Sequence, residues 1–317
     1  MDLTQTAHRL TVRHLRVVAV IQAEGSLMHA ATALNMTQSA VTKALQDTEA
    51  QMRVQLFERT NRGVVPTDIG LKLAAHARLI LAQIDKAEQE VAHLRDGTAG
   101  HVTIGTLLAG SAGLLPEAIV RLRRDQPGLV VRVEEGTNDM LMPALRSGEL
   151  DLVLGRLPEF RDREGLKQEY LIDDFAQIVV RRDHPLVAQP DLQLADLLAY
   201  DWILPGHSTT LRRQIDKAFR DENLEPPTHS VETVSFLTTR RLLRQADYLA
   251  VWPVQLAELE VQDGAIVALQ IPLPTARRPI GISTRVADVI SPAAARLVES
   301  LRQAARHLKT GSSEPLQ

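Results

Sequence analysis

A stretch without proline, from Asp68 to about Asp96, divides this chain into two parts of different character. Its apolar residues recur at alternating spacings of four and three positions: Leu73, Ala77, Ile80, Ile84, Ala87, Val91 and Leu94. This heptad pattern predicts one long amphipathic helix. The helix either packs on its own domain or pairs with the same helix of a second chain. The charged residues that flank the seam favour pairing.

Before this stretch, the sequence predicts three short helices. The first runs from Val12 to Gly25, the second covers Leu27–Leu34 behind the N-cap Ser26, and the third begins after Thr37. Asn35 is suited to end the second helix in the left-handed conformation. Two short helices, a tight turn and a third helix are the parts of a helix-turn-helix.

A small hairpin is predicted after the third helix. Leu56–Thr60 and Val64–Thr67 flank the turn Asn61-Arg62-Gly63, where glycine favours a tight reversal. A hairpin in this position forms the wing of a winged helix-turn-helix.

After a predicted hinge at Gly97–Gly100, strands and helices alternate. Strands are predicted at His101–Leu108, Leu129–Glu134, Leu150–Leu154, Phe175–Arg181, Trp202–Leu204, Val231–Thr233, Tyr248–Trp252, Ile266–Leu269 and Ile280–Arg285. Helices are predicted at Gly113–Arg124, Asp139–Ser147, Thr210–Asn223, Ser235–Gln245 and Pro292–Leu308. This alternation predicts parallel α/β sheets in two lobes, with a ligand cleft at the carboxyl ends of the strands. The chain is expected to cross between the lobes near Leu171–Asp173 and near Pro272–Pro274.

The composition of the chain excludes several classes of functional site. The chain has no cysteine, so thiolate metal sites and cysteine nucleophiles are excluded, and neither a metal nor a cofactor is expected. No apolar run approaches a membrane span, and the amino-terminus lacks a secretion signal, so we expect a cytoplasmic protein.

Up to Thr67 there are seven basic and five acidic residues, a net charge of +2, whereas the remainder carries −5. A mildly basic front on an acidic body suits a localised DNA contact.

The segment from Ala30 to Lys43, followed by Leu56-Phe57-Glu58-Arg59 and Thr67, resembles the LysR-type transcriptional regulators. The long helix and the two-lobed body agree with that family over the full length. Two positions depart from its pattern: Ser39 stands where proline is common, and Arg53 stands where glycine is usual. If residue 53 needs a positive φ, arginine costs about 1 kcal/mol of strain there.

The helix-turn-helix predicts a set of DNA-binding residues. An amide at the start of the third helix bonds adenine or other base edges, and neighbouring polar and basic side chains reach bases or phosphates. The predicted set is Thr37, Gln38, Ser39, Thr42 and Lys43 on the third helix, and Arg59 and Arg62 on the wing. For any single residue, simple solvation remains the alternative.

The effector residues are predicted from two sources. Ser111 and Thr209-Thr210 are expected at helix starts that face the cleft, where free N–H groups favour an anionic or strongly hydrogen-bonding effector. The family resemblance adds Ala109, Thr137, Asn138, Thr233, Ser235 and Trp252. Each of these residues is alternatively a helix cap or a buried group. Arg156, at a strand end, is interpreted either as a partner of an anionic effector or as a solvated surface residue.

The sequence disfavours three other functions. An enzyme is disfavoured because the chain shows no nucleophile elbow, phosphate loop, dinucleotide fingerprint or metal-spaced histidine pair. An exported solute-binding protein conflicts with the DNA-reading front end. A nucleoid-packing protein would be smaller and strongly basic.

The sequence therefore predicts an all-α winged helix-turn-helix, a long linker helix and an α/β two-lobed effector domain that resembles periplasmic binding proteins. The predicted limits are 1–67 for the DNA-binding domain, 68–97 for the dimerisation helix, and 98–310 for the effector domain, with lobe I at 98–171 and 274–310 and lobe II at 172–273. The resemblance implies a regulator of a catabolic or uptake operon, in the branch that includes regulators of sugar uptake and protocatechuate breakdown. Its implied partners are double-stranded operator DNA, a small anionic or polar effector such as an aromatic acid or sugar derivative, and RNA polymerase. It also implies a homodimer that assembles into a homotetramer.

Overall fold

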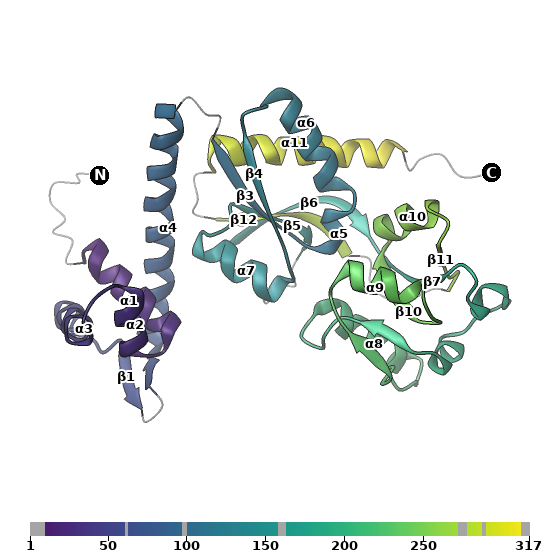
Figure 1. Ribbon diagram of the computed structural model, residues 1–317, viewed down its shortest axis with the longest axis horizontal. Helices are drawn as coiled ribbons and strands as arrows, with labels where there is room; N and C mark the ends of the chain where they lie inside the picture. The colour runs from purple at the N-terminus through teal and green to yellow at the C-terminus, as the bar shows by residue number, and fades with distance from the viewer. Residues whose placement is uncertain are drawn as a thin grey trace. The chain divides into compact units, whose positions relative to one another are not determined.

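The computed structural model describes residues 10–60, 63–96, 100–157, 163–271, 278–286 and 290–311. The chain divides into two compact units, with the main boundary at residue 97 (Figure 1). Arg62, most of the predicted hinge, the predicted second crossover and residues 312–317 lie outside the described residues.

The first unit begins with three helices whose ends follow local signals: α1 (Val12–Glu24), α2 (Leu27–Ala33) and α3 (Gln38–Met52). Gly25 ends α1 in the left-handed conformation at φ 60°. Asn35 adopts φ 53° in the turn after α2. Ser26 and Thr37 accept backbone hydrogen bonds as the N-caps of α2 and α3. The predicted helix-turn-helix is confirmed.

One apolar core holds these helices together. Val18 and Ile21 of α1, Ala30 of α2 and Val41 of α3 are completely buried, and they join one cluster. Burying such side chains stabilises a fold by about 1.5–3 kcal/mol each for the larger ones. The inner face of α3 is therefore committed to packing.

The wing is an antiparallel pair of strands, β1 (Phe57–Thr60) and β2 (Gly63–Pro66). The next helix, α4 (Asp68–Asp96), starts immediately behind it. The Thr67 hydroxyl donates to the Leu56 carbonyl and accepts from the Gly70 N–H. A Cβ at position 70 would lie 2.0 Å from the Leu56 carbonyl oxygen, so this close approach requires glycine.

The two halves of the α4 heptad seam differ in burial. Ala77 is completely buried in a cluster with Leu15 and Ala19 of α1, and Leu73 packs against it. Further along, Ile80, Ala87 and Val91 are exposed. The amino-terminal part of the seam thus packs on its own unit, while the later part leaves three of its apolar residues exposed.

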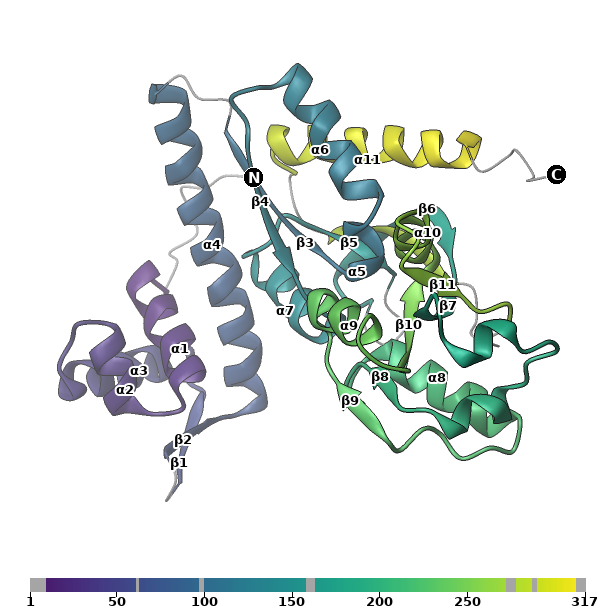
Figure 2. The ribbon, with the colours of Figure 1, turned by 45° about the vertical axis from the view of Figure 1, so that its right-hand side comes forward.

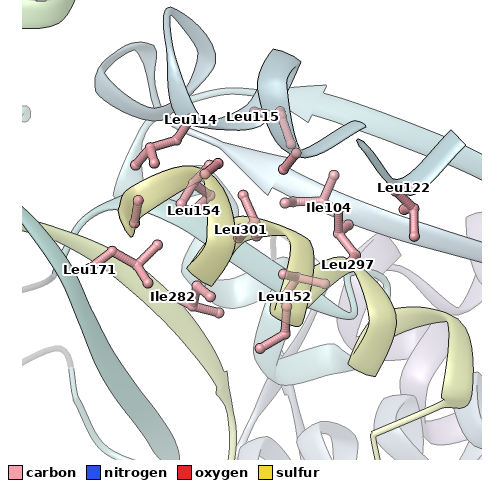
Figure 3. Close-up of a cluster of buried hydrophobic side chains, with 14 of the residues drawn as sticks. Ile104, Leu114, Leu115, Leu122, Leu152, Leu154, Leu171, Ile282, Leu297 and Leu301 are labelled. Atoms are coloured by element: carbon pink, nitrogen blue, oxygen red, sulfur yellow. The ribbon is translucent and has the colours of Figure 1, made fainter. Parts of the chain in front are cut away.

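The second unit holds two five-stranded sheets. The first has the order β4 (Val130–Glu135), β3 (His101–Thr106), β5 (Leu152–Arg156), β12 (Arg278–Arg285) and β6 (Leu166–Asp174). Helices α6 (Leu114–Asp125) and α11 (Pro292–Gly311) pack on one face, where Ile104, Leu152 and Leu154 meet Leu297 and Leu301 (Figure 3). Helix α7 (Asn138–Ser147) covers the other face through Leu141 and Leu145, against Val153.

The second sheet has the order β11 (Ile266–Ala268), β7 (Ala176–Arg181), β10 (Leu249–Pro253), β8 (Trp202–Leu204) and β9 (Ser230–Glu232). Helix α8 (Thr210–Asp221) packs on one face (Figure 2). Helices α9 (Phe236–Leu243) and α10 (Val254–Gln262) pack on the other. Two 3-10 helices, η2 (Pro185–Ala188) and η3 (Leu194–Ala199), lie between β7 and β8 in the chain.

Several expectations for this unit were wrong in detail. The sheets are mixed, because β12 runs antiparallel to β5 and β6, and β7 runs antiparallel to β10 and β11. Strand β6 and helix α10 were not predicted. Leu108 begins the short helix α5 (Leu108–Ser111) rather than ending a strand. The first crossover comes slightly later than predicted, because only Phe175 separates β6 from β7.

Candidate DNA-binding face and effector site

The outer face of α3 carries the predicted DNA-binding residues. Thr37, Gln38, Ser39 and Lys43 are exposed, and Thr42 is half-buried. Val41, Ala44 and Leu45 point into the core on the opposite side. The helix therefore presents a continuous polar face that extends from its first residue.

Two hydroxyls at the start of α3 are engaged with each other. The Thr37 Oγ1 lies 3.1 Å from the Ser39 Oγ and accepts a hydrogen bond from the Ala40 N–H at 3.2 Å. Thr37 thus caps the helix, and Ser39 occupies the position of the family proline without disturbing the helix start. Gln38, between them, is left with an exposed amide.

The wing adds Arg59, which is exposed on β1. The wing is joined to α3 by Glu49, whose Oε1 accepts hydrogen bonds from the backbone N–H groups of Leu56 at 2.7 Å and Phe57 at 3.3 Å. Arg59 is consequently presented at a defined position relative to α3. Arg53, between the two elements, has φ 56°, so this position does adopt the positive φ at which arginine is strained.

In the second unit, the predicted effector residues follow the carboxyl ends of parallel strands. In the first sheet, β3 is parallel to its neighbours β4 and β5. In the second sheet, β8 is parallel to its neighbours β9 and β10. Neighbouring parallel strands end at the same edge of a sheet, so each sheet gathers its own predicted residues at one edge. The two sets come from α5 and the β4–α7 turn in the first sheet, and from the β8–α8 loop, the β9–α9 turn and the end of β10 in the second.

Ser111 does not start a helix. It is the last residue of α5, and its hydroxyl donates to the Leu108 carbonyl at 3.1 Å. The following helix, α6, has Gly113 as its N-cap and no side-chain cap. The expectation of a Ser111 helix start was wrong because the sequence pattern did not indicate the short helix α5. Ala109, in the same helix, is buried.

Thr137 and Asn138 form the turn from β4 into α7. The Thr137 hydroxyl donates to the Asp139 carboxylate, and its carbonyl accepts from the N–H groups of Met140 and Leu141. The Asn138 Oδ1 is buried and accepts no hydrogen bond from the described residues. An amide oxygen in that state is available to a donor on a ligand.

Thr209 and Thr210 begin α8 as predicted. The Thr209 hydroxyl donates to the Gly206 carbonyl at 2.8 Å and accepts from the Arg212 N–H at 3.3 Å. The Thr210 hydroxyl accepts from the Arg213 guanidinium at 3.1 Å. Both hydroxyls are thus already partnered, and they shape the loop before α8.

A charged network that the sequence interpretation missed lies beneath this loop. The Arg212 side chain, 4% exposed, donates to Asp216 at 2.8 Å and lies 3.4 Å from Glu232 at the end of β9. The His207 imidazole lies within 3.5 Å of the same two carboxylates. The i,i+4 spacing of Arg212 and Asp216 was a readable signal of the first contact. The contact with Glu232 depends on strand pairing, so no local spacing indicates it.

Thr233, Ser235 and Trp252 lie at the ends of β9 and β10. The Ser235 hydroxyl caps α9 by accepting from the Thr238 N–H, and the Ser235 N–H donates to the Thr233 hydroxyl at 3.0 Å. Trp252 is only 2% exposed, and its ring lies 5.4 Å from that of Phe236 between centroids. Leu108 and Ala112 pack against the same cluster, so the Ala109–Ser111 region adjoins the end of β10.

The structure contradicts both interpretations of Arg156 that the sequence suggested. Its Nε and Nη2 atoms lie 2.6 Å from Oδ2 of Asp174, which is completely buried. Arg156 therefore pairs inside the protein rather than with an effector or with solvent. Burial raises the pKa of the Asp174 carboxyl, while the charge of Arg156 and the N–H groups of Val254 and Phe175 oppose that rise.

Among the described residues, no group of three or more histidine, aspartate or glutamate side chains is arranged to hold a metal ion. No helix in the described ranges is both long enough and apolar enough to cross a membrane.

Comparison with known proteins matches both units. Residues 12–71 match the bacterial regulatory helix-turn-helix protein model of the lysR family, and residues 95–306 match the LysR substrate binding domain. The transcriptional regulator GbpR of Azospirillum brasilense is 32% identical over 298 residues, covering 93% of this chain and 87% of that protein. The regulator PcaQ of Agrobacterium fabrum is 28% identical over 309 residues, covering 96% and 98%.

The fold also matches solved structures. Full-length CbnR complexed with its target DNA superposes with a TM-score of 0.61 at 20% identity, covering 93% of this chain and all of that one. These matches bear out the predicted fold class, and the family is one of regulators rather than enzymes. A helix-turn-helix with a polar outer face, joined to a two-sheet effector domain and matched by both family models, identifies the chain as a member of the LysR family of DNA-binding transcriptional regulators.

Proposed function

We propose that the chain reads a palindromic operator through the outer face of α3 and the wing. The residues proposed to contact DNA are Thr37, Gln38, Ser39, Thr42, Lys43, Arg59 and Arg62. The observation that carries the proposal is the division of α3 into one side on which Val41 is completely buried and another on which Gln38, Ser39 and Lys43 are exposed. Polar side chains at the start of such a helix reach base edges in the major groove.

Selection of genomic fragments by the purified full-length protein tests operator binding. Enrichment of one palindromic site supports the proposal, and a folded protein that enriches no site contradicts it. The role of Gln38 is then tested on that site with Gln38→Ala. Loss of one good base contact costs about 1–3 kcal/mol, which is roughly a 5- to 150-fold loss of affinity.

Gln46→Ala is the matched control, because Gln46 is also exposed on α3 but lies two turns further along. Operator affinity unchanged by Gln38→Ala, or reduced equally by Gln46→Ala, would remove Gln38 from the base-reading residues. Circular dichroism of both variants checks that α3 remains folded.

The second proposed function is binding of a small anionic or polar effector, such as an aromatic acid or a sugar derivative. The proposed contacts are Ala109, Ser111, Thr137, Asn138, Thr209, Thr210, Thr233, Ser235 and Trp252. The support is their common position after the carboxyl ends of parallel strands, together with the unpartnered buried Oδ1 of Asn138. Hydroxyls and amides at such an edge orient a polar ligand.

A panel of sugars and aromatic acids, added to the operator-binding assay, tests this proposal. A compound that shifts binding in the wild type, but not in Thr210→Val or Asn138→Leu, supports the site. Lys217→Ala is the control, since Lys217 is exposed on α8 and pairs only along that helix with Asp221 among the described contacts. An unaltered response in both site variants would contradict it.

The remaining proposals concern organisation. We infer domain limits of 1–67, 68–97 and 98–310, a cytoplasmic location, control of a catabolic or uptake operon, and contact with RNA polymerase.

The exposed Ile80, Ala87 and Val91 of α4 support a homodimer through this helix, and two such dimers would form the homotetramer. Sedimentation of the wild type and of Val91→Glu tests the dimer: an unchanged mass in the variant excludes pairing at that residue.

A further inference from the structure

The crossover between the two sheets contains a buried ion pair. Asp174 is the last residue of β6, and Phe175 alone separates it from β7 in the second sheet. Arg156 is the last residue of β5 in the first sheet. Its guanidinium contacts the Asp174 carboxylate through two nitrogens, each at 2.6 Å. The Arg156 side chain is 11% exposed and the Asp174 side chain is not exposed at all.

The residue that follows Asp174 contacts the start of α10. The N–H of Val254, the first residue of α10, donates to the Phe175 carbonyl at 2.9 Å. Pro253, the N-cap of α10, contributes no side-chain cap. The Phe175 carbonyl therefore accepts one of the N–H groups that a helix start leaves without a partner inside the helix.

The start of α10 is continuous with the end of β10, where Trp252 lies. Trp252 pairs with Gln177, and Pro253 pairs with Ala176, so the ends of β7 and β10 meet beside Phe175. Trp252 also contacts the ring of Phe236 at the start of α9. A shift of the first turn of α10 would therefore displace Trp252 and the proposed effector residue Ser235, which caps α9.

We propose that Arg156 and Asp174 are positioning residues, which hold the first turn of α10, and with it Trp252, in place from the crossover between the two sheets. Burying two charges costs desolvation, and the contact of two Arg156 nitrogens with the Asp174 carboxylate offsets that cost. Both residues belong to the first sheet, and Phe175, which follows Asp174, leads into β7 of the second sheet and contacts α10, so the pair also couples the two lobes. Its role in the effector response rests on the proposed effector site, whereas the positioning of Trp252 does not.

Fluorescence quenching of Trp252 tests the positioning directly. The chain has two tryptophans, so Trp202→Phe leaves Trp252 as the sole reporter in the full-length protein. Acrylamide reaches a buried indole poorly, and the quenching constant is expected to be low in this background. Arg156→Gln is expected to raise that constant about two-fold or more, because the first turn of α10 opens locally.

Further variants separate positioning from general loss of structure. Arg156→Gln leaves a buried carboxylate without a cation, so the double variant Arg156→Gln with Asp174→Asn provides a neutral pair that folds if the single variant does not. The double variant is expected to raise the quenching constant too. Arg156→Lys keeps the charge and is expected to stay closer to the Trp202→Phe background than Arg156→Gln.

Arg121→Gln is the matched control, because Arg121 pairs with Glu117 on α6 at 2.7 Å with both side chains about one-third exposed. It is expected to leave Trp252 quenching unchanged. An unchanged constant in folded Arg156→Gln or in the double variant overturns the proposal. An equal rise in Arg121→Gln, or a lysine variant no better than the glutamine variant, overturns it as well. None of these outcomes depends on finding the effector, so they remain distinct from failure of the proposed function.

Discussion

Glu49 accepts a hydrogen bond from the backbone N–H of Leu56 at 2.7 Å, which joins the end of α3 to the chain entering the wing. The same Oε1 accepts from Phe57 at 3.3 Å. A single side chain thereby satisfies two backbone donors where the chain passes from helix to strand. This contact, together with the burial of Phe57 and Val64 in the core of the first unit, holds the wing beside the proposed DNA-reading helix.

Glu49→Ala is expected to lower the free energy of unfolding by about 1–3 kcal/mol, because two partly buried N–H groups lose their charged acceptor. The loss is measured by urea denaturation. Operator affinity should fall as well, since the wing is no longer held against α3.

Glu49→Gln is the control, because its amide oxygen can still accept. Glu49→Gln is expected to lose less than half as much stability as Glu49→Ala loses. A stability of Glu49→Ala within error of the wild type would contradict the role assigned to this carboxylate.

Arg53 holds a left-handed conformation, at φ 56° and ψ 36°, immediately after α3. Side chains branched at Cβ tolerate this region poorly. Arg53→Val is therefore expected to destabilise the first unit by about 1–2 kcal/mol. Arg53→Gly is expected to raise stability slightly, by up to about 1 kcal/mol. Both are compared by thermal denaturation, and a valine variant as stable as the glycine variant would exclude backbone strain at this position.

Arg285 is buried at the end of β12, and its Nη1 donates to the carbonyls of Leu145 and Leu150. These carbonyls flank the turn that follows α7. Arg285→Met removes the donor and is expected to lower the free energy of unfolding by about 2–4 kcal/mol, because two buried acceptors lose a charged partner. Denaturant titration followed by circular dichroism measures the loss. Arg132→Met, at an exposed position on β4 of the same sheet, should change stability by less than about 0.5 kcal/mol.

Glu169 on β6 is bound at two points by Arg302 on α11, at 2.6 and 2.8 Å. This guanidinium lowers the pKa of Glu169 below its ordinary value of 4.5. A carboxyl whose pKa is lower in the folded state contributes stability above the unfolded value and loses it as pH falls through the folded value. Glu169→Gln is therefore expected to be less stable than the wild type at pH 7, and the difference should shrink as pH falls below 4.5.

Denaturation of both proteins between pH 7 and pH 3 measures this difference. A gap that stays constant through the acid range would mean that packing, rather than the charge of Glu169, accounts for it. The exposure of both side chains, 34% for Glu169 and 42% for Arg302, keeps the expected effect small.

Local signals in the sequence predicted the first unit well. Gly25, Ser26, Asn35 and Thr37 end or cap helices through hydrogen bonds and backbone conformations that involve residues at most four positions away. Such contacts are visible in sequence spacing. The proposed DNA-binding face follows from the same local periodicity, because the spacing of Val41, Ala44 and Leu45 determines which side of α3 is buried.

The second unit was harder to predict in detail, because its decisive contacts join residues that are distant in sequence. The antiparallel strand β12 enters the first sheet from more than a hundred residues beyond β5, and no local pattern indicates its direction. Ser111 was misplaced because the four residues of α5 are too few to show helical periodicity.

The sequence by itself determined the helix-turn-helix, the long helix and the two sets of α/β elements, since capping, periodicity and turn chemistry act between near neighbours. The tertiary structure alone decided which charges that are distant in sequence meet. Arg156 contacts Asp174 because the end of β5 lies beside the crossover. Arg212 contacts Glu232 because β8 pairs with β9. A long-range ion pair depends on how strands are ordered in a sheet, and that order is selected by the packing of whole cores rather than by the residues that form the pair.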